Sequence, residues 1–313
     1  FCWILKQLIN PSIMRKFIIT LAAVLLSVYS FAQPTHTVTD AEKKYKEVKE
    51  HIAKEEYAFA YTAVKELRAM YPDNIASNHN YINEDVAYFY VLCGLKLVQE
   101  RAEAEAVNYI ASVTNEPRRQ LMSFHLAHYY FLKNEYGPAI DYFSRAGYEN
   151  LSNEQIADAK FEKAYAHFNL KQFAQAKPLF NEIHQIPDNK YYIPANYYYG
   201  FISYYDRDYA EALKSFQLVE NQEEYRNVVP YYIAEIYYFQ GNKDQALSYG
   251  QSVLDRQQSF YYEKQLKLLI GQLYFERKDY AKGLPLLEDY VNSSDKVSKE
   301  VLYELSYCYY IQD

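Results

Sequence analysis

Small and apolar residues recur along the chain in one spacing, with a period of 33 to 37 residues between its clearest copies. A small residue is followed twelve positions later by Ala or Gly and, in most copies, sixteen positions later by a large apolar residue. This arrangement predicts two amphipathic helices joined by a turn in each copy. The clear copies are Ala127/Ala139/Phe143, Ala164/Ala176/Phe180, Gly200/Ala212/Phe216, Ala234/Ala246/Gly250 and Gly271/Gly283/Leu287, and weaker ones are Val48/Ala60/Val64 and Gly94/Ala106/Ile110.

The spacing also predicts how the helices pack. Small residues at matching heights let two helix backbones approach closely, and the large apolar residues fill the space between hairpins. Each hairpin keeps an apolar face that only its neighbour covers, so several must stack. We expect an all-α, right-handed α-solenoid of stacked helix-turn-helix repeats, with seven complete hairpins from about Ala41 to Ser294. A last copy that opens at Ser306 predicts the first helix of an eighth.

Two further features accompany the spacing. Polar turns followed by an aromatic residue occur at 133–136, 171–173, 207–209 and 277–280, and Tyr130, Tyr237, Tyr274 and Tyr309 lie three residues after a small one. With these features the chain resembles the tetratricopeptide repeat family, of the exported bacterial type, over nearly everything after residue 40. The resemblance implies a protein-interaction scaffold. The sequence departs from the family pattern where His51, Leu97, His167 and Ser203 replace the Tyr.

One connection differs from the others. The run Pro72–Ile82 is rich in Pro, Asn and Ser and lengthens the chain between two repeats by about ten residues. These residue types favour turns, so we expect a loop there.

The N-terminal region has the three parts of a secretory signal peptide. Basic residues follow Met14, a mostly apolar run covers 17–28, and Ser30-Phe31-Ala32 is a small-x-small cleavage site before Gln33. The run is shorter than a membrane-spanning helix requires. We therefore expect a signal peptide at 14–32, a short linker at 33–40 and the solenoid at 41–313, truncated at its C-terminal end. Residues 1–13 are interpreted as upstream translation or a fragment edge.

These features predict transport across the inner membrane to the periplasm or envelope. No Cys follows the expected cleavage site, which argues against a lipoprotein. Beyond Cys2 the chain contains only Cys93 and Cys308, which are too far apart in a solenoid to form a disulfide. The net charge of −7 and the pI near 5.6, without a basic stripe, make nucleic acid an unsuitable partner.

The 38 tyrosines raise the question of a binding face. In the family's architecture, the first helix of each hairpin lines the concave face through the residues three before, one after and four after the small residue. Six of these lining positions hold Glu235, Leu268, Gln272, Tyr303, Tyr307 and Tyr310, and the other twelve hold the residues named at the end of this paragraph. Aromatic residues are enriched at binding hot spots; alternatively, each Tyr replaces Leu in a bulky core. The resemblance implies partner contacts by Phe124, His128, Phe131, Phe161, Tyr165, Phe168, Tyr197, Phe201, Tyr204, Tyr231, Tyr238 and Phe275.

The chemistry of these positions bears on the kind of partner. Family members that hold a C-terminal carboxylate use cations and amides on this face, and here only Lys49 has such a place. We therefore expect an extended peptide or an apolar helix. His125 and His128 form half of a metal site without a further ligand, and the sequence lacks the local motifs of hydrolase, phosphate, zinc and redox chemistry. We expect no enzyme activity and no cofactor.

Two functional hypotheses remain open at this stage. The chain is either an exported scaffold that gathers envelope proteins, or the N-terminal sensory region of a longer envelope signalling protein whose output domain follows.

Overall fold

Helices occupy most of the chain in the computed structural model, which describes residues 40–70, 80–256 and 259–312. No strand occurs within these ranges. The all-α fold class is therefore confirmed. The segments expected as upstream residues, signal peptide and linker lie outside the described residues, apart from residue 40.

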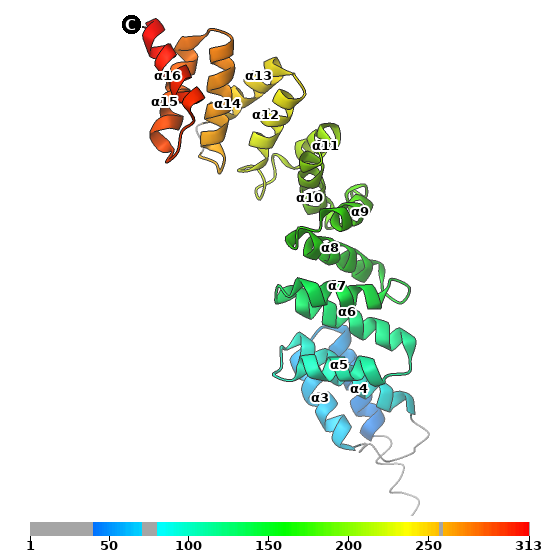
Figure 1. The fold of residues 1–313 in the computed structure, drawn as a ribbon. Helices are drawn as coiled ribbons and strands as arrows, with labels where there is room; N and C mark the ends of the chain where they lie inside the picture. The colour runs from blue at the N-terminus through cyan, green and yellow to red at the C-terminus, as the bar shows by residue number, and fades with distance from the viewer. Residues whose placement is uncertain (1–39, 71–79, 257–258, 313) are drawn as a thin grey trace, which may run out of the picture. The chain divides into compact units, whose positions relative to one another are not determined.

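The helices follow one another in pairs, and the order agrees with seven hairpins and a further first helix over the described ranges. In chain order they are the helix at 40–53 with α3 (Tyr57–Met70), α4 (Asn80–Lys96) with α5 (Ala102–Ser112), α6 (Glu116–Leu132) with α7 (Tyr136–Ala146), α8 (Asn153–Asn169) with α9 (Phe173–His184), α10 (Tyr192–Tyr205) with α11 (Tyr209–Val219), α12 (Val229–Phe239) with α13 (Lys243–Leu254), α14 (Glu263–Glu276) with α15 (Tyr280–Ser293), and α16 (Lys299–Gln312) (Figure 1).

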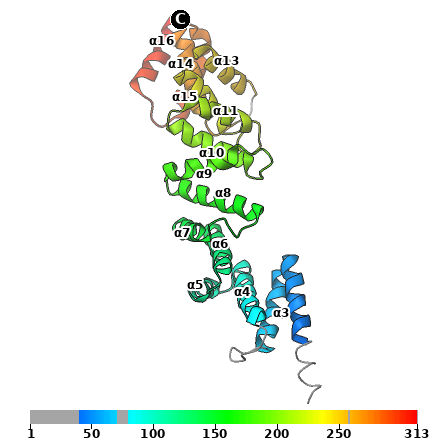
Figure 2. The ribbon, with the colours of Figure 1, turned by 90° about the vertical axis from the view of Figure 1, so that its right-hand side faces the viewer.

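The chain forms two compact units. The first contains the described residues up to Tyr130 together with Ser144–Asn150, and in it α4 packs against both α3 and α5. The second contains Phe131–Phe143 and the residues from Leu151 onward. In Figure 1 α8 to α16 follow one another in chain order, and Figure 2 shows the order of α8 to α11 from another side. In this second unit, which carries most of the candidate site, each first helix packs against the second helix of its own hairpin.

The turn inside each hairpin is built in one way. The second residue after the first helix has a positive φ, at Glu55, Val98, Asn134, Lys171, Arg207, Gly241 and Lys278 in chain order. At Lys171 the backbone N–H donates to the carbonyl of Phe168 at 3.0 Å, and the next N–H, that of Gln172, donates to His167 at 2.9 Å. This pair of bonds is the Schellman motif, which satisfies carbonyls left free at a helix end.

The α4–α5 hairpin departs from the predicted spacing. In the other six hairpins the positive-φ residue lies seven positions after the small residue, but Val98 lies only four positions after Gly94. The α4–α5 turn contains the additional residues 99–101, so the predicted register of Gly94 in the first helix is wrong by three residues, and Val91 occupies the equivalent place. The loop predicted at Pro72–Ile82 is likewise too long, because α4 already begins at Asn80; residues 71–79 lie outside the described ranges.

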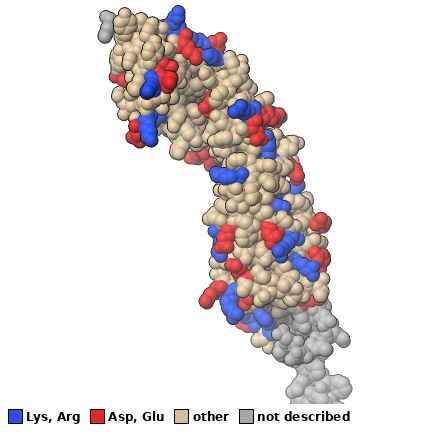
Figure 3. Space-filling model, viewed as in Figure 1, with Lys and Arg blue, Asp and Glu red and all other residues tan. Residues whose placement is uncertain are grey.

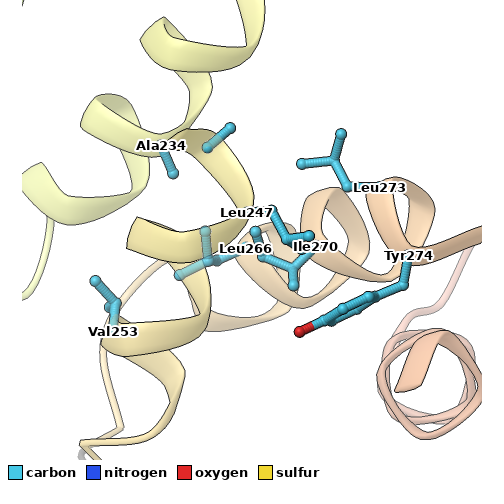
Figure 4. Close-up of a cluster of buried hydrophobic side chains, with 8 residues drawn as sticks. Ala234, Leu247, Val253, Leu266, Ile270, Leu273 and Tyr274 are labelled. Carbon is cyan, nitrogen blue, oxygen red and sulfur yellow. The ribbon is translucent and has the colours of Figure 1, made fainter. Parts of the chain in front are cut away.

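The core lies where the small and large positions of the repeat meet. Ala164, Ala176 and Ala212 are fully buried, and Phe143, Phe180 and Phe216 are among the largest side chains without solvent exposure. Figure 4 shows the cluster in which Leu247 of α13 packs with Leu266 and Ile270 of α14. The predicted spacing therefore identifies the packed positions of the second unit.

Gly250 breaks the pattern of a large residue at the sixteenth position, and its neighbours explain why. A Cβ atom there would collide with Ile270 and lie only 3.2 Å from Leu266 Cδ1. Two α14 side chains thus fill the space that Phe180 or Phe216 fills in other hairpins. The glycine is required by close packing, since its backbone is part of an ordinary helix.

Candidate partner-binding face

The first helices carry all twelve residues predicted to contact a partner. Phe124 and His128 lie on the part of α6 that belongs to the first unit, and Phe124 is buried, with 5% of its surface exposed. Little of the Phe124 ring is therefore available to a ligand. The other ten belong to the second unit and are all half-buried: Phe131, Phe161, Tyr165, Phe168, Tyr197, Phe201, Tyr204, Tyr231, Tyr238 and Phe275.

Rings of the second unit form a continuous series of contacts across successive hairpins. Phe131 meets Tyr165 edge-on, with ring centroids 5.7 Å apart, and Tyr165 meets Tyr198 at 5.3 Å. The series continues through Phe168–Tyr198 at 4.8 Å, Phe168–Phe201 at 5.4 Å, Phe201–Tyr232 at 5.9 Å and Tyr232–Tyr262 at 5.5 Å. We call the half-buried residues Phe131, Phe161, Tyr165, Phe168, Tyr197, Phe201, Tyr204, Tyr231 and Tyr238 the aromatic face.

Phe275 stands apart from this series. Its ring contacts are with Tyr280, at 5.5 Å between centroids, and with Tyr307 of α16, at 5.8 Å. It belongs to a separate aromatic group on α14, α15 and α16.

A carboxylate on α12 is held in place by two tyrosines of the aromatic face. The Tyr204 hydroxyl donates to Glu235 Oε2 at 2.5 Å, and the Tyr231 hydroxyl donates to Glu235 Oε1 at 2.8 Å. Burial, and then the hydrogen bond to Glu235, raises the pKa of Tyr204. Burial and the charge of Glu235 likewise raise the pKa of Tyr231. Both hydroxyls therefore remain protonated donors at neutral pH, and Glu235 has two fixed neutral partners.

A cavity of about 290 Å³ opens beside this carboxylate, between α12, α14 and α16. Aromatic rings of Tyr231, Tyr238 and Phe239 and the apolar side chains of Leu268 and Leu273 form much of its lining. The polar part of the lining includes Gln272 and three carboxylates, those of Glu235, Glu276 and Glu304. We call this cavity the α12–α14–α16 pocket.

A larger cavity, of about 510 Å³, lies between α13, α15 and the end of α14, and its polar groups are paired with one another. Arg277 forms an ion pair with Asp244, and Lys282 pairs with Asp279 at 2.9 Å. The Tyr274 hydroxyl donates to Gln251 at 3.2 Å. This arrangement is typical of a solvated surface between helices.

Several aromatic residues next to the predicted positions were missed. Tyr205 and Phe239 each lie one residue beyond a predicted position and are 58% and 48% exposed, more than any residue predicted in the second unit. The Phe239 ring stacks on Tyr209, with centroids 5.4 Å apart, and Tyr205 lies 4.7 Å from Phe201. The signal was present in the sequence, because both are aromatic residues that end a first helix.

Charged residues of both signs are interspersed on the surface shown in Figure 3, with broad uncharged areas between them. Many of the charged groups pair with each other, such as Lys177 with Asp206 at 2.7 Å and Lys190 with Asp158 at 2.6 Å. Lys49, the one cation predicted for a carboxylate ligand, lies over the ring of Tyr45 at 5.4 Å.

The two histidines considered as a metal half-site have different surroundings. The ring Nε2 of His125 lies 3.1 Å from the Tyr88 hydroxyl, and its Nδ1 is buried without a hydrogen-bond partner. Burial, with smaller contributions from Lys96 and His128, lowers the pKa of His125 to about 3. Within the described ranges, no group of three or more His, Cys, Asp or Glu residues is arranged to hold a metal ion.

Cys93 and Cys308 are both buried and free, and burial raises the pKa of Cys93 to about 12. The structure over residues 40–70, 80–256 and 259–312 also contains no helix with the length and apolar character needed to cross a membrane.

Comparisons with known proteins bear on the fold. No family model matches the sequence, and no match was found among curated proteins. Solved structures do match. The C-terminal part of a TPR repeat-containing protein from Cytophaga hutchinsonii is 15% identical with a TM-score of 0.52, covering 83% of this chain and 99% of that one.

Two other structures show a similar likeness. Naa15/Naa10 bound to HypK-THB matches at 10% identity and a TM-score of 0.53, over 86% of this chain and 39% of that one. A tetratricopeptide repeat protein from Parabacteroides merdae matches at 13% identity and a TM-score of 0.43, over 86% and 98% of the two chains. The chain has the α-solenoid fold of tetratricopeptide repeat proteins.

Proposed function

We propose that this chain with a tetratricopeptide-repeat fold is a protein-interaction scaffold, which holds an extended or helical segment of a partner protein on its aromatic face. The observation that carries the proposal is the series of ring contacts from Phe131 to Tyr262. Tyr232 in this series is buried, and the other rings are held by their neighbours yet remain half-buried, so a ligand meets a rigid surface. Rigid aromatic side chains provide contact area at a low cost in conformational entropy.

The middle of this face is its strongest candidate for a hot spot. Phe201 of α10 contacts Phe168 of the preceding hairpin and Tyr232 of the following one. Tyr205, one helical turn further along α10, is 58% exposed beside it. Binding energy concentrates where surrounding contacts exclude water from aromatic anchors.

The test is a selection of peptides from a displayed random library against the intact chain, followed by titration of the best binders. We expect Phe201→Ala and Tyr205→Ala each to weaken binding by about thirtyfold, on the order of 2 kcal/mol. Tyr205→Ala is the decisive variant, because its exposed ring contributes little to the core. Lys214→Ala on exposed α11 surface is the matched control.

Circular dichroism must show that each variant keeps the parent helix content. The proposal is wrong if Tyr205→Ala and a folded Phe201→Ala bind with parent affinity, or if Lys214→Ala weakens binding as much as they do.

Export to the bacterial periplasm or envelope is part of the same proposal. It is supported by the basic, apolar and small-x-small segments at 14–32, which lie outside the described residues. Mass spectrometry of the protein from an envelope fraction should find Gln33 at its N-terminus. Intact protein beginning at Met14 in the cytoplasm would contradict export.

A further inference from the structure

Two carboxylates of the α12–α14–α16 pocket have no cation close to them. Among the residues that the structure describes, Glu235 accepts hydrogen bonds from the hydroxyls of Tyr204 and Tyr231, and Glu304 accepts one from Gln272 Nε2 at 3.0 Å. Among the described residues, no Lys, Arg or His forms an ion pair with either carboxylate. The third carboxylate, Glu276, is different, because Lys243 pairs with it at 2.6 Å. The pocket thus has an excess of negative charge.

The fixed position of Glu235 makes this charge useful for recognition. Its two oxygens are each oriented by a neutral hydroxyl, so the side chain loses little further freedom when a ligand arrives. Each carboxylate oxygen has more than one acceptor site, so both can still receive a hydrogen bond. Neutral donors orient the group without cancelling its charge.

The aromatic walls favour a cation as well. The faces of tyrosine rings attract cations, and Tyr238 already does so, because Lys243 Nζ lies 5.7 Å from its ring centroid. A volume near 290 Å³ is at the lower end for ligand sites, which suits one long side chain better than a complete small molecule.

We propose that the α12–α14–α16 pocket binds an arginine side chain of the partner segment. This rests on the proposed function, since it assigns the chemistry of one residue in the segment that the aromatic face holds. Charge complementarity selects the occupant. A guanidinium is planar, stacks on rings such as those of Tyr231 and Tyr238, and donates several hydrogen bonds at once to carboxylate and amide oxygens, here Glu235, Glu304 and Gln272. The ammonium group of a lysine is not planar and cannot donate two parallel hydrogen bonds to a carboxylate.

The experiment uses peptides selected from the displayed random library against the intact 313-residue chain. We expect arginine to recur at one position, and a synthetic peptide with Gln in place of that Arg to bind at least tenfold more weakly. A peptide with Lys at the same position should bind with an affinity between those of the Arg and Gln peptides. The affinity of the Arg peptide should decrease with added salt, and that of the Gln peptide should not.

A carboxylate variant with a matched control links this effect to the pocket. Glu235→Gln removes the charge and keeps the shape of the side chain. Its amide oxygen can accept from one tyrosine hydroxyl, and its amide N–H can donate to the other. We expect it to weaken the Arg peptide at least tenfold while leaving the Gln peptide unchanged. The control is Glu220→Gln, because Glu220 also accepts a tyrosine hydroxyl, from Tyr249 at 2.5 Å, but lies outside the pocket. It should bind both peptides as the parent does.

The outcomes separate the two proposals. Two results overturn the pocket proposal and leave the scaffold proposal standing. In the first, the selected peptides depend on Tyr205 but share no arginine. In the second, they share an arginine, but Glu235→Gln does not change their affinity. Peptides that need arginine and Glu235 but not Tyr205 or Phe201 support the pocket and contradict the aromatic face beyond Tyr231 and Tyr238, which line the pocket themselves. Equal loss of affinity in Glu220→Gln and Glu235→Gln also overturns the pocket.

Discussion

Individual aromatic residues of the second unit contribute to the fold as well as to its surface. Phe161 stacks on Tyr191 with ring centroids 4.2 Å apart, and Tyr197 stacks on Tyr225 at 4.4 Å. Such pairs contribute about 0.5–1.5 kcal/mol beyond the burial of their area. The two interpretations of the tyrosines, core packing and partner binding, are therefore compatible for most of these rings. Tyr205, with its largely exposed ring, separates them experimentally.

The buried His125 provides a prediction about pH. Its pKa is lowered from 6.5 to about 3 by burial, so in the pH range between these values the unfolded chain binds a proton that the folded chain does not. The contribution of His125 to the free energy of unfolding should therefore be constant above pH 6.5. As the pH falls from 6.5 toward 3, this contribution should decrease by roughly 1.4 kcal/mol per pH unit.

Other groups titrate in the same range, including His184, whose pKa burial also lowers. The difference between the parent and His125→Gln isolates the one residue. Urea unfolding at pH 7 and pH 5 should show a smaller loss of stability in His125→Gln than in the parent. An equal loss in both would mean that His125 is accessible to protons in the folded chain.

The sequence predicted individual positions only in part. Periodicity identifies the face of a helix on which Tyr165 or Phe201 lies, and both are on the half-buried face that was expected. It does not reveal how far a neighbouring hairpin covers a ring, and Phe124 is covered almost completely. The contact of Glu235 with Tyr204 was equally inaccessible, because Tyr204 is 31 residues away in the chain, whereas its other partner Tyr231 lies one helical turn before it.

At the scale of elements, the recurrent turn imposes a left-handed backbone on one residue in each hairpin. Gly241 is the only glycine among these seven residues, and the other six accept an unfavourable φ between 51° and 62°. The left-handed region costs a residue with a Cβ roughly 1–2 kcal/mol. The recurrent turn therefore lowers the stability of the chain at each of these six positions.

Gly241→Ala and Gly137→Ala form a matched pair that tests this cost. Beyond the chain neighbours, a Cβ at either position would meet no atom within 4 Å, but Gly241 has a φ of 78° whereas Gly137 lies in the first turn of α7, directly before Pro138. We expect Gly241→Ala to lower the free energy of unfolding by about 1 kcal/mol. Gly137→Ala should change it by less, because the helix-forming preference of Ala is offset by the conflict between its Cβ and the ring of Pro138.

Both values come from denaturant unfolding at one pH. If Gly241→Ala is as stable as the parent, the left-handed turn is not maintained in solution.

The sequence predicted the hairpins well and one register poorly. The small residue gives the register of the first helix correctly at Ala164 and Gly200, each of which lies seven residues before the positive-φ residue of its turn. In α4 the small residue Gly94 predicts the wrong register, because Val91 lies seven residues before the turn residue Val98, and Gly94 instead lies beside Ala102, whose Cβ is 3.6 Å from a Cβ built on Gly94. Additional residues in a turn shift one helix against the other without changing the periodicity of either.

At the scale of the whole molecule, stability depends on neighbours in the stack. In the second unit, α10 packs against α9 and α11, and α12 packs against α11, α13 and α14. By contrast, α16 packs against α15 and α14 only, and Leu302, Tyr303 and Tyr310 on it are exposed. Nearest-neighbour interactions dominate the energetics of repeat arrays.

Hydrogen exchange measured by mass spectrometry should show a gradient within this unit. In the 313-residue chain we expect the amides of α10 to α13 to exchange slowest and those of α16 fastest, because local opening costs least where few contacts are lost. Equal protection from α8 to α16 would instead mean that the second unit opens only as a whole.

Gly250 has a consequence for the history of the chain. Repeat arrays are often regarded as strings of interchangeable parts, but the side chains of Ile270 and Leu266 occupy the space above this glycine. A copy of the α10–α11 hairpin, which has Phe216 at the equivalent position, could not precede α14 without a clash. The hairpins α12–α13 and α14–α15 are therefore matched to each other at this contact, and exchanging one of them alone would require smaller or rearranged side chains at 266 and 270.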